Sequence, residues 1–367
     1  MKHITILADS NIASLTDFFS TTTLGQLTER TIDIVPVAGR DIDAKLLAEI
    51  QPDVLLIRSV TQVNEALLAN NDSVQFVGSA TIGTDHVDQD YLMQRHITFA
   101  NAAGCSKHSV AQYVLTAALT LRPQYWQQSV TLGIIGLGNI GSTLVQYAND
   151  LGWQVLGYDP LLPKSKINNA SLEQVLSQSD VVSLHVPLTD KESDAHSRGS
   201  NYPTRHLIDA DSLALMPADT ILINSARGPV IEADALVADI ERTGRQVVLD
   251  VFEHEPQIAE QLLSKLAFAT PHIAGYTLEG KLRGTQIIYD ALCEKLAVLP
   301  TQTMHRLLPL NLFLWSELKA HPDRLIKFYD IQQDDASLRS KEIEGQVNGA
   351  DFDGLRRDYH LRREWQF

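Results

Sequence analysis

The stretch Thr131-Leu-Gly-Ile-Ile-Gly-Leu-Gly-Asn-Ile-Gly141 joins a short apolar run to the glycine pattern Gly-x-Gly-x-x-Gly. The apolar run predicts a buried strand, and the residues after Gly141 have the periodicity of an amphipathic helix. In that context the first glycine allows a tight turn, the second a close approach of the backbone to a ligand, and the third close helix packing. The helix N-terminus attracts negative charge. We therefore predict that a dinucleotide pyrophosphate binds at Gly136, Gly138, Asn139, Ile140 and Gly141.

A carboxylate follows the glycine turn at the spacing that a dinucleotide site requires. Asp159 directly follows the predicted strand 154–158, about 20 residues beyond the last glycine. A carboxylate there accepts hydrogen bonds from the adenosine ribose and repels a 2′-phosphate, so we predict NAD rather than NADP as the cofactor. The alternative, in which Asp159 starts a turn into Pro160, is compatible with this role.

Short apolar runs alternate with helical patterns on both sides of the glycine turn, which predicts parallel sheets covered on both faces. The first hundred residues lack a glycine turn and are interpreted as a smaller α/β domain. Beyond Pro300 the alternation is lost, which indicates a third unit, and the polar run 189–204 is a long candidate loop. The predicted strands are 4–7, 32–35, 54–57, 76–77, 97–99, 131–135, 154–158, 181–185, 220–223 and 247–251; the predicted helices are 44–50, 65–69, 109–121 and 281–299.

Composition restricts the class of protein. A chain of 367 residues that is 44% hydrophobic can bury two or three cores. A net charge of −15 argues against a nucleic-acid partner, although it leaves an anionic substrate possible because a few local cations decide that. Two cysteines, Cys105 and Cys293, fit a reducing compartment. We see no signal peptide, membrane span or metal-ligand pattern and expect a soluble cytoplasmic protein without a membrane partner.

Two strands of the second half end in charged residues. Arg227 follows the apolar run 221–223, and Asp250 ends the run 247–249. In open parallel sheets, ligands bind outside the carboxyl ends of the strands. A guanidinium there can bind a carboxylate at two points. The alternative for Arg227 is a surface ion pair, which the buried run before it disfavours.

A glutamate and a histidine complete a possible catalytic set. Glu255 lies directly before Pro256, and His272 follows Pro271. A lone histidine is more often a core or surface residue. A glutamate bound to one ring nitrogen, however, fixes the tautomer and stabilises the imidazolium when the other nitrogen takes a proton. Together with Arg227, this set predicts the oxidation of a 2-hydroxy acid.

These motifs, in this order, resemble those of the D-isomer-specific 2-hydroxyacid dehydrogenases. The resemblance implies that Arg227 binds the substrate carboxylate and that His272 is the general acid/base with Glu255 as its partner. It also implies cofactor contacts at Asp159, Val186 (mainly through its backbone), Ala226, Asp250 (near the nicotinamide) and Gly275. The motifs that carry the resemblance are Gly136–Gly141, Ser183-Leu-His-Val-Pro187, Asn224-Ser-Ala-Arg-Gly228, Leu249-Asp-Val-Phe252 and Pro271-His272.

Finer motifs resemble one branch of this family, which has an additional C-terminal segment. The branch implies oxidation of 4-phospho-D-erythronate to (R)-3-hydroxy-2-oxo-4-phosphobutanoate, on the route to pyridoxal 5′-phosphate. It also implies a homodimer and substrate contacts at Ser59, Thr81 and Tyr276. The motifs are Arg58-Ser-Val-Thr-Gln-Val-Asn64, 78–87, 272–281, 329–339 and 355–365.

The resemblance implies a three-domain α/β protein. Residues 102–271 would form a doubly wound, parallel-sheet Rossmann domain that binds NAD. Residues 1–101 and 272–290 would form a smaller flavodoxin-like substrate (lid) domain, and 291–367 a C-terminal α+β dimerisation domain.

Three alternatives remain at this stage. The substrate could be another 2-hydroxy acid such as 3-phosphoglycerate. The protein could instead be a non-catalytic NAD-sensing module. The tail arginines Arg356, Arg357, Arg362 and Arg363 are interpreted as solvated or intersubunit ion pairs, with a less favoured role across a dimer at the substrate phosphate.

Overall fold

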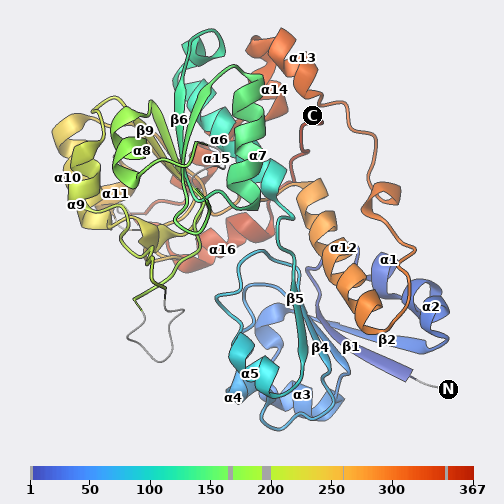
Figure 1. The fold of residues 1–367 in the computed structure, drawn as a ribbon. Helices are drawn as coiled ribbons and strands as arrows, with labels where there is room; N and C mark the ends of the chain where they lie inside the picture. The colour runs from blue at the N-terminus through green and yellow to red at the C-terminus, as the bar shows by residue number, and fades with distance from the viewer. Residues whose placement is uncertain (1–2, 164–167, 192–199, 259, 344–345) are drawn as a thin grey trace. The chain divides into compact units, whose positions relative to one another are not determined.

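The computed structural model describes residues 3–163, 168–191, 200–258, 260–343 and 346–367. Part of the predicted loop 189–204 therefore lies outside the described residues. The chain folds into two compact units (Figure 1). The first comprises Met1–Ser106 and Thr277–Asn311, and the second comprises Lys107–Tyr276 and Leu312–Phe367.

The first unit contains a five-stranded parallel sheet in the order β2-β1-β3-β4-β5. This is the flavodoxin-like order, and it confirms the predicted fold of this part. One face packs on α1 and α12, and the other packs on α3, α4 and α5. The elements are β1 (His3–Asp9), α1 (Leu15–Phe19), α2 (Gln26–Thr28), β2 (Thr31–Val37), α3 (Ala44–Ile50), β3 (Val54–Ile57), α4 (Glu65–Leu68), β4 (Phe76–Ser79), α5 (Gln89–Gln94), β5 (Thr98–Asn101) and α12 (Leu278–Lys295).

The second unit contains a six-stranded parallel sheet in the order β11-β10-β9-β8-β6-β7. A single bridge between Gly157 and Asn169 extends pairing beyond β7. The chain leaves β6 towards β7 on one side and later returns to β8 on the other, so β6 lies at the topological switch point where doubly wound sheets bind nucleotides. The strands are β6 (Thr131–Ile135), β7 (Gln154–Tyr158), β8 (Val181–Leu184), β9 (Ile221–Asn224), β10 (Val247–Leu249) and β11 (Phe268–Ala269).

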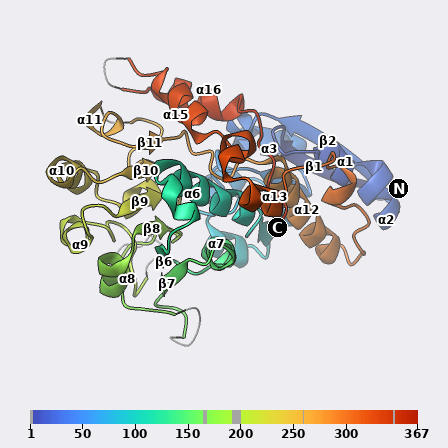
Figure 2. The same ribbon diagram turned by 90° about the horizontal axis from the view of Figure 1, so that it is seen from above.

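Helices cover both faces of this second sheet (Figure 2). On one face, α6 and α7 bury the side chains of alternate strand residues such as Leu132 and Ile134. On the other face, α8, α9 and α10 pack on Ile135 and Leu184. These helices are α6 (Lys107–Leu121), α7 (Asn139–Asp150), α8 (Leu172–Gln178), α9 (Ala210–Leu215) and α10 (Ala233–Thr243), with the short α11 (Glu260–Leu263) beyond them.

The C-terminal residues belong to the second compact unit. Trp315 and Trp365 stack with ring centroids 5.6 Å apart, and both lie in the same buried cluster as α6 and α7. The described part of 312–367 therefore shares a core with the six-stranded sheet. The predicted division, with 291–367 as a domain of its own, stays a prediction. The tail helices are α13 (Trp315–Ala320), α14 (Leu325–Phe328), α15 (Ile331–Arg339) and α16 (Gly349–Arg357).

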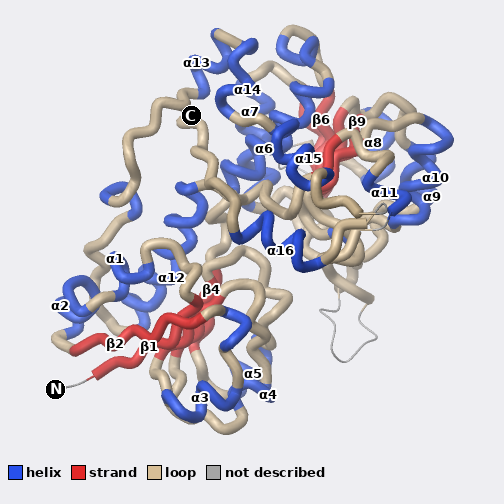
Figure 3. Tube along the Cα trace, turned by 180° about the vertical axis from the view of Figure 1, so that it is seen from behind, coloured by secondary structure: helices blue, strands red, loops and turns tan. Residues whose placement is uncertain are grey.

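The secondary structure matches the sequence analysis closely outside the tail (Figure 3). All ten predicted strands are present with small changes at their ends, whereas the two-residue β11 was not predicted. The β pairing in the described part of the tail consists of isolated bridges, such as Leu314 with Gln366. Among the described residues, no helix is both long and apolar enough to cross a membrane.

Candidate active site

The glycine turn after β6 has the geometry that a pyrophosphate requires. Gly136 has a φ of +95°, and a β-carbon at Gly141 would lie 2.1 Å from the carbonyl oxygen of Gly136. Both positions therefore need glycine. Gly138 is different, because a β-carbon there would meet no atom within 4 Å. It is also the N-cap of α7 and offers no side chain to the first turn. The first N–H groups of a helix have no hydrogen-bond partner within the helix, and open space beside them can hold a phosphate group.

Asp159 lies at the same turn, as the sequence predicted. Its carboxylate accepts hydrogen bonds from the backbone N–H groups of Leu137 and Leu161, both at 3.0 Å. Each carboxylate oxygen has further acceptor capacity for a ribose hydroxyl. These contacts also support the turn towards Pro160, so both roles considered for Asp159 are compatible with the structure.

Val186 follows β8 on the other side of the glycine turn. His185 N–H donates to the carbonyl oxygen of Ile135 at 2.7 Å, and a β-carbon on Gly136 would lie 2.6 Å from the His185 carbonyl oxygen. The backbone before Val186 is therefore in direct contact with the turn. Burial lowers the pKa of His185 to about 3, so this imidazole is neutral.

The loop that carries Arg227 is fixed by its own strand. The Asn224 side chain accepts from Ala226 N–H at 3.0 Å and donates to the carbonyl oxygen of Arg227 at 2.9 Å. The guanidinium Nη1 donates to the carbonyl oxygen of Ala226 at 2.7 Å. Next in the chain, a β-carbon on Gly228 would lie 1.9 Å from the carbonyl oxygen of Phe252, so this loop is in backbone contact with the loop after β10.

Glu255 and His272 form the predicted pair. His272 Nδ1 lies 2.9 Å from Glu255 Oε2, and Phe252 N–H donates to the other glutamate oxygen at 2.8 Å. The neighbouring Glu253 has a different partner, because its Oε1 lies 2.6 Å from His206 Nε2. His272 is about one-third exposed, which leaves the ring accessible to a ligand.

Electrostatics favour a charged glutamate beside a basic imidazole. Burial alone would raise the pKa of Glu255, but the His272 charge, its hydrogen bond and the Phe252 N–H hold that pKa below its usual value. Burial likewise opposes the charged form of His272, yet Glu255 raises the pKa of this histidine above its usual value. With Nδ1 bound to Glu255, Nε2 is the nitrogen that can exchange a proton.

Asp250 supports the loop on which His272 lies. Its carboxylate is buried and accepts from the Thr270 hydroxyl at 2.6 Å, Ile273 N–H at 2.8 Å and Ala274 N–H at 2.9 Å. Burial raises the pKa of Asp250 to about 6, against the lowering effects of His272 and these hydrogen bonds. The contacts show that Asp250 fixes the loop that carries His272; the predicted nicotinamide contact stays a prediction.

Two tail arginines contact this loop in their own chain. Arg356 Nη2 lies 3.4 Å from the Tyr276 hydroxyl, and Arg362 donates to the carbonyl oxygens of Ile273 and Ala274. The interpretation of the tail arginines as solvated side chains is therefore wrong for Arg356 and Arg362. Arg356 also pairs with Asp353 of its own chain at 3.6 Å, and the intersubunit ion pairs stay a prediction. The side chains of Arg356 and Arg362 are near the loop because the tail packs on the helices and strands of the second unit, and the sequence does not reveal that packing.

The predicted hydroxyl residues of the first unit lie at one edge of its sheet. Ser59 is exposed just after β3, and Thr81 is half-buried just after the neighbouring β4. The Thr81 hydroxyl lies 2.8 Å from the hydroxyl of Ser79. Parallel strands bring both residues to the carboxyl edge, where ligands bind. Gly275, also predicted, lies in the second unit, and its carbonyl oxygen accepts from Ser109 at 3.5 Å.

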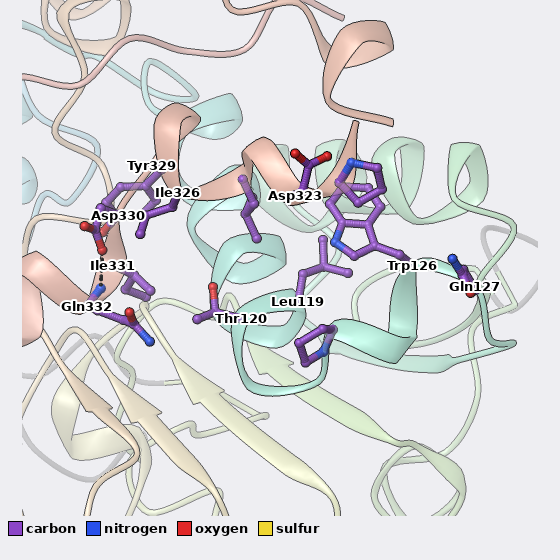
Figure 4. A pocket seen from close by; sticks show the side chains of 13 residues that line it. Leu119, Thr120, Trp126, Gln127, Asp323, Ile326, Tyr329, Asp330, Ile331 and Gln332 are labelled. Carbon is purple, nitrogen blue, oxygen red and sulfur yellow. Dashed lines mark hydrogen bonds between the residues drawn. The ribbon is translucent and has the colours of Figure 1, made fainter. Parts of the chain in front are cut away.

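A cavity of about 360 Å³ lies elsewhere in the second unit, between the end of α6 and the tail (Figure 4). None of the predicted site residues lines it. Tyr329, Ile331 and Leu325 contribute from the tail, and Leu119 and Trp126 contribute from α6 and the turn after it. Elsewhere, Cys105 and Cys293 are both buried and form no disulfide.

Comparisons with known proteins agree with this geometry. Residues 120–274 match the family model described as D-isomer specific 2-hydroxyacid dehydrogenase, NAD binding domain. The erythronate-4-phosphate dehydrogenase of Psychrobacter arcticus is 74% identical, with all of both chains covered. That of Acinetobacter baylyi is 48% identical over 98% of this chain and 97% of its own. The chain belongs to the erythronate-4-phosphate dehydrogenase family.

Solved structures of other dehydrogenases share the fold. A D-lactate dehydrogenase from Aquifex aeolicus, complexed with NAD and lactic acid, matches with a TM-score of 0.63 and 25% identity over 80% of this chain and 95% of its own. A 3-phosphoglycerate dehydrogenase from Entamoeba histolytica with bound NAD⁺ matches with a TM-score of 0.66, 18% identity, and 80% and 96% coverage. The NAD-binding fold and the NAD cofactor predicted from the sequence are confirmed.

Two residues that support this site, Thr270 and Tyr113, were not predicted from the sequence. Thr270 and Tyr113 bind each other at 2.7 Å and link α6 to Asp250. The position of Thr270 directly before Pro271-His272 was a usable signal. Tyr113 gave none, because a tyrosine within an apolar helix is typical of any core.

Proposed function

We propose that the protein catalyses the NAD-dependent oxidation of 4-phospho-D-erythronate at C2, giving (R)-3-hydroxy-2-oxo-4-phosphobutanoate for pyridoxal 5′-phosphate biosynthesis. The observation that carries the proposal is the 2.9 Å contact between His272 and Glu255, next to the loop of Arg227, in a chain 74% identical to a named erythronate-4-phosphate dehydrogenase. The protein is an NAD-dependent dehydrogenase by family.

Arg227 binds and orients the substrate in this proposal. Its planar guanidinium can form two parallel hydrogen bonds with the C1 carboxylate. The hydrogen bonds of Asn224 hold the loop, and the Gly228–Phe252 backbone contact holds it beside the loop that contains Glu255. A substrate bound by its carboxylate therefore has its neighbouring carbon at a fixed place relative to His272.

His272 and Glu255 remove the hydroxyl proton. The neutral Nε2 of His272 takes the proton of the C2 hydroxyl as the C2–H bond breaks and the carbon–oxygen double bond forms. Glu255 stabilises the resulting imidazolium through Nδ1, because a charged carboxylate at 2.9 Å favours the protonated ring. In the reverse direction the same imidazolium returns the proton to the oxygen.

NAD supplies the acceptor for the hydride that leaves C2. The residues that would hold it are the glycine turn, with Gly138 at the pyrophosphate, and Asp159 at the ribose. Val186, Ala226, Asp250 and Gly275 are proposed as its further contacts. Ser59, Thr81 and Tyr276 are proposed as hydroxyl donors to the phosphorylated substrate, since hydroxyls are effective donors to anionic oxygens.

We also propose a cytoplasmic homodimer that assembles through the tail. Large apolar side chains there are more than half exposed, including Leu312, Ile326, Ile343 and Phe367. Apolar side chains that are exposed together in one patch are typical of a protein interface. Sedimentation equilibrium gives a direct test: a mass of one chain of 40.7 kDa at micromolar concentration contradicts the dimer.

The proposed reaction is tested in the direction of reduction. Purified enzyme is mixed with NADH and 3-hydroxy-2-oxo-4-phosphobutanoate, and in parallel with 3-phosphohydroxypyruvate, hydroxypyruvate and glyoxylate. A kcat/KM at least tenfold higher for the four-carbon phosphate supports the proposal. A preference for another oxo acid replaces the substrate but keeps the chemistry. NADH binding without turnover of any oxo acid contradicts an enzymatic role.

A further inference from the structure

The loop that carries His272 is bound from two sides through the same two residues. On one side, the buried Asp250 accepts hydrogen bonds from the N–H groups of Ile273 and Ala274 at 2.8 and 2.9 Å. On the other side, Arg362 Nη2 donates to the carbonyl oxygens of Ala274 at 2.6 Å and Ile273 at 3.3 Å. The polar backbone groups immediately after the catalytic histidine are thus fully paired with a carboxylate and a guanidinium.

The guanidinium of Arg362 is itself fixed in place by the tail. Its Cζ lies 3.8 Å from the centroid of the Tyr329 ring, which is the geometry of a cation–π contact. The hydroxyls of Tyr329 and Tyr359 donate to one oxygen of Asp334 at 2.8 and 2.9 Å. This carboxylate acts on the Arg362 charge through space. The cation therefore lies on an aromatic ring, in the field of a carboxylate that two tyrosines fix.

The conformation of the loop explains why it needs such support. His272 has a φ of +57°, in the left-handed region that non-glycine residues seldom occupy. Such a conformation persists only when surrounding contacts fix it. Within the loop, His272 N–H donates to the Thr270 carbonyl oxygen at 3.0 Å, and Tyr276 N–H donates to that of Ile273 at 2.8 Å. Glu255, Ser109 and Arg356 contact the side chain or carbonyl group of single loop residues. Asp250 and Arg362 are the side chains that bind the backbone of the two residues directly after His272.

We propose that Arg362 is a positioning residue for catalysis, which holds the loop of His272 so that the imidazole meets Glu255 and the substrate hydroxyl. The tail thereby takes part in the chemistry of its own chain, in addition to any role in assembly. Arginine suits this task better than lysine. Its planar group can reach two carbonyl oxygens and lie flat on Tyr329 at once, whereas an ammonium group acts as a point charge.

The test uses Arg362→Lys and Arg362→Met, with Arg357→Lys and Arg357→Met as matched controls. Arg357 is an exposed arginine at the end of α16, where it pairs with Asp358 at 3.0 Å. Amide hydrogen exchange of a peptide covering residues 270–276 reports on the loop without any substrate. We expect exchange there to accelerate about tenfold or more in the Arg362 variants, with β6 and α7 as protected as before.

Kinetics supply the second measurement, and this arm alone rests on the proposed function. Arg362→Lys should lower kcat about 10–100-fold, since small displacements of a catalytic group have large effects on rate, while KM for NADH changes little. The pH dependence of kcat should shift as well. The charged groups that face His272 are Glu255, Asp250 and Arg356, and a displaced ring loses part of its contact with Glu255. The Arg357 variants should match the wild type in every measurement.

Two results overturn the proposal. One is a folded Arg362→Lys enzyme with wild-type loop exchange and kcat. The other is faster exchange that extends equally through β6 and α7, which identifies a general role in stability. Arg362→Lys keeps the buried charge, so it is the deciding variant if Arg362→Met does not fold. If no oxo acid is reduced even by the wild type, the proposed function fails while the exchange result still decides the role of Arg362.

Discussion

Gly228 lies so close to Phe252 that a β-carbon on the glycine would be 1.9 Å from the phenylalanine carbonyl oxygen. Gly228 follows Arg227 in the loop after β9, and Phe252 lies in the loop that leads from β10 to Glu255. Phe252 N–H also donates to Glu255 at 2.8 Å. This one backbone contact therefore links the proposed substrate-binding cation to the carboxylate of the proposed acid/base pair.

Gly228→Ala should remove activity and destabilise the second unit. Two backbone segments must separate to admit the methyl group, and overpacking of this kind costs about 1–3 kcal/mol or more. Thermal unfolding and kcat/KM are measured together. Gly354→Ala in α16 is the control, because a β-carbon there meets only the far end of Arg357 at 3.8 Å. A Gly228→Ala enzyme with wild-type kcat/KM contradicts the proposed link.

Gly138→Ala should separate cofactor binding from folding. Gly138 has a φ of −68°, which alanine adopts readily, and a β-carbon would meet no protein atom within 4 Å. The unliganded enzyme should therefore unfold at the wild-type temperature. The methyl group would project into the space proposed for the pyrophosphate, where a steric conflict of about 1–3 kcal/mol weakens binding roughly 5- to 150-fold.

Titration calorimetry with NADH checks this second expectation. Gly141→Ala is the contrasting variant, because its β-carbon would lie 2.1 Å from the Gly136 carbonyl oxygen and should disturb the fold itself. Unchanged NADH affinity in a folded Gly138→Ala enzyme would place the pyrophosphate elsewhere.

The glycine turn and the charged strand ends could be predicted because each depends on local chain geometry. Gly136 and Arg227 lie where a short apolar run stops, and parallel strands bring such positions to one edge. The tail contacts could not be predicted in this way. Gln112 on α6 binds the backbone of Trp365 at 3.0 Å across 253 residues of sequence, and no local periodicity encodes a pairing at that separation. In the sequence, Arg362 and Arg357 differ in nothing but position. In the structure, Arg362 binds the loop of His272, whereas Arg357 is exposed.

Glu255→Gln should lower the activity and move its pH dependence to lower pH. Burial lowers the pKa of His272, and the Glu255 charge and hydrogen bond overcome that effect to raise it. Oxidation needs the neutral imidazole, so in the wild type activity rises as pH increases through this raised pKa. A neutral glutamine leaves burial dominant, and the rising limb of kcat/KM moves down in pH. The rate itself should fall by about 10²–10⁴-fold, because the imidazolium loses its stabilising charge.

Glu253→Gln is the matched control for this change. Glu253 lies two residues away in the same loop, but it binds His206 at 2.6 Å and not His272. Its replacement should leave the pH profile of kcat/KM in place. An equal shift in both variants would show that net charge in the loop, and not the His272 partner, sets the profile.

Arg356→Met should move the same limb in the opposite direction. The Arg356 charge lowers the pKa of His272 and that of Glu255, and its Nη2 lies 3.4 Å from the Tyr276 hydroxyl. Without this cation, the imidazolium is easier to form, so the neutral base needed for oxidation appears only at higher pH. The kcat/KM profile from pH 6 to 10 is compared with that of Arg357→Met, which removes an exposed guanidinium one residue away. The prediction is contradicted if the Arg356→Met profile coincides with that of the wild type or shifts to lower pH. A shift to higher pH, together with the downward shift of Glu255→Gln, would show that two opposing charges set the pKa of His272: a carboxylate in the loop after β10 and a cation in the tail.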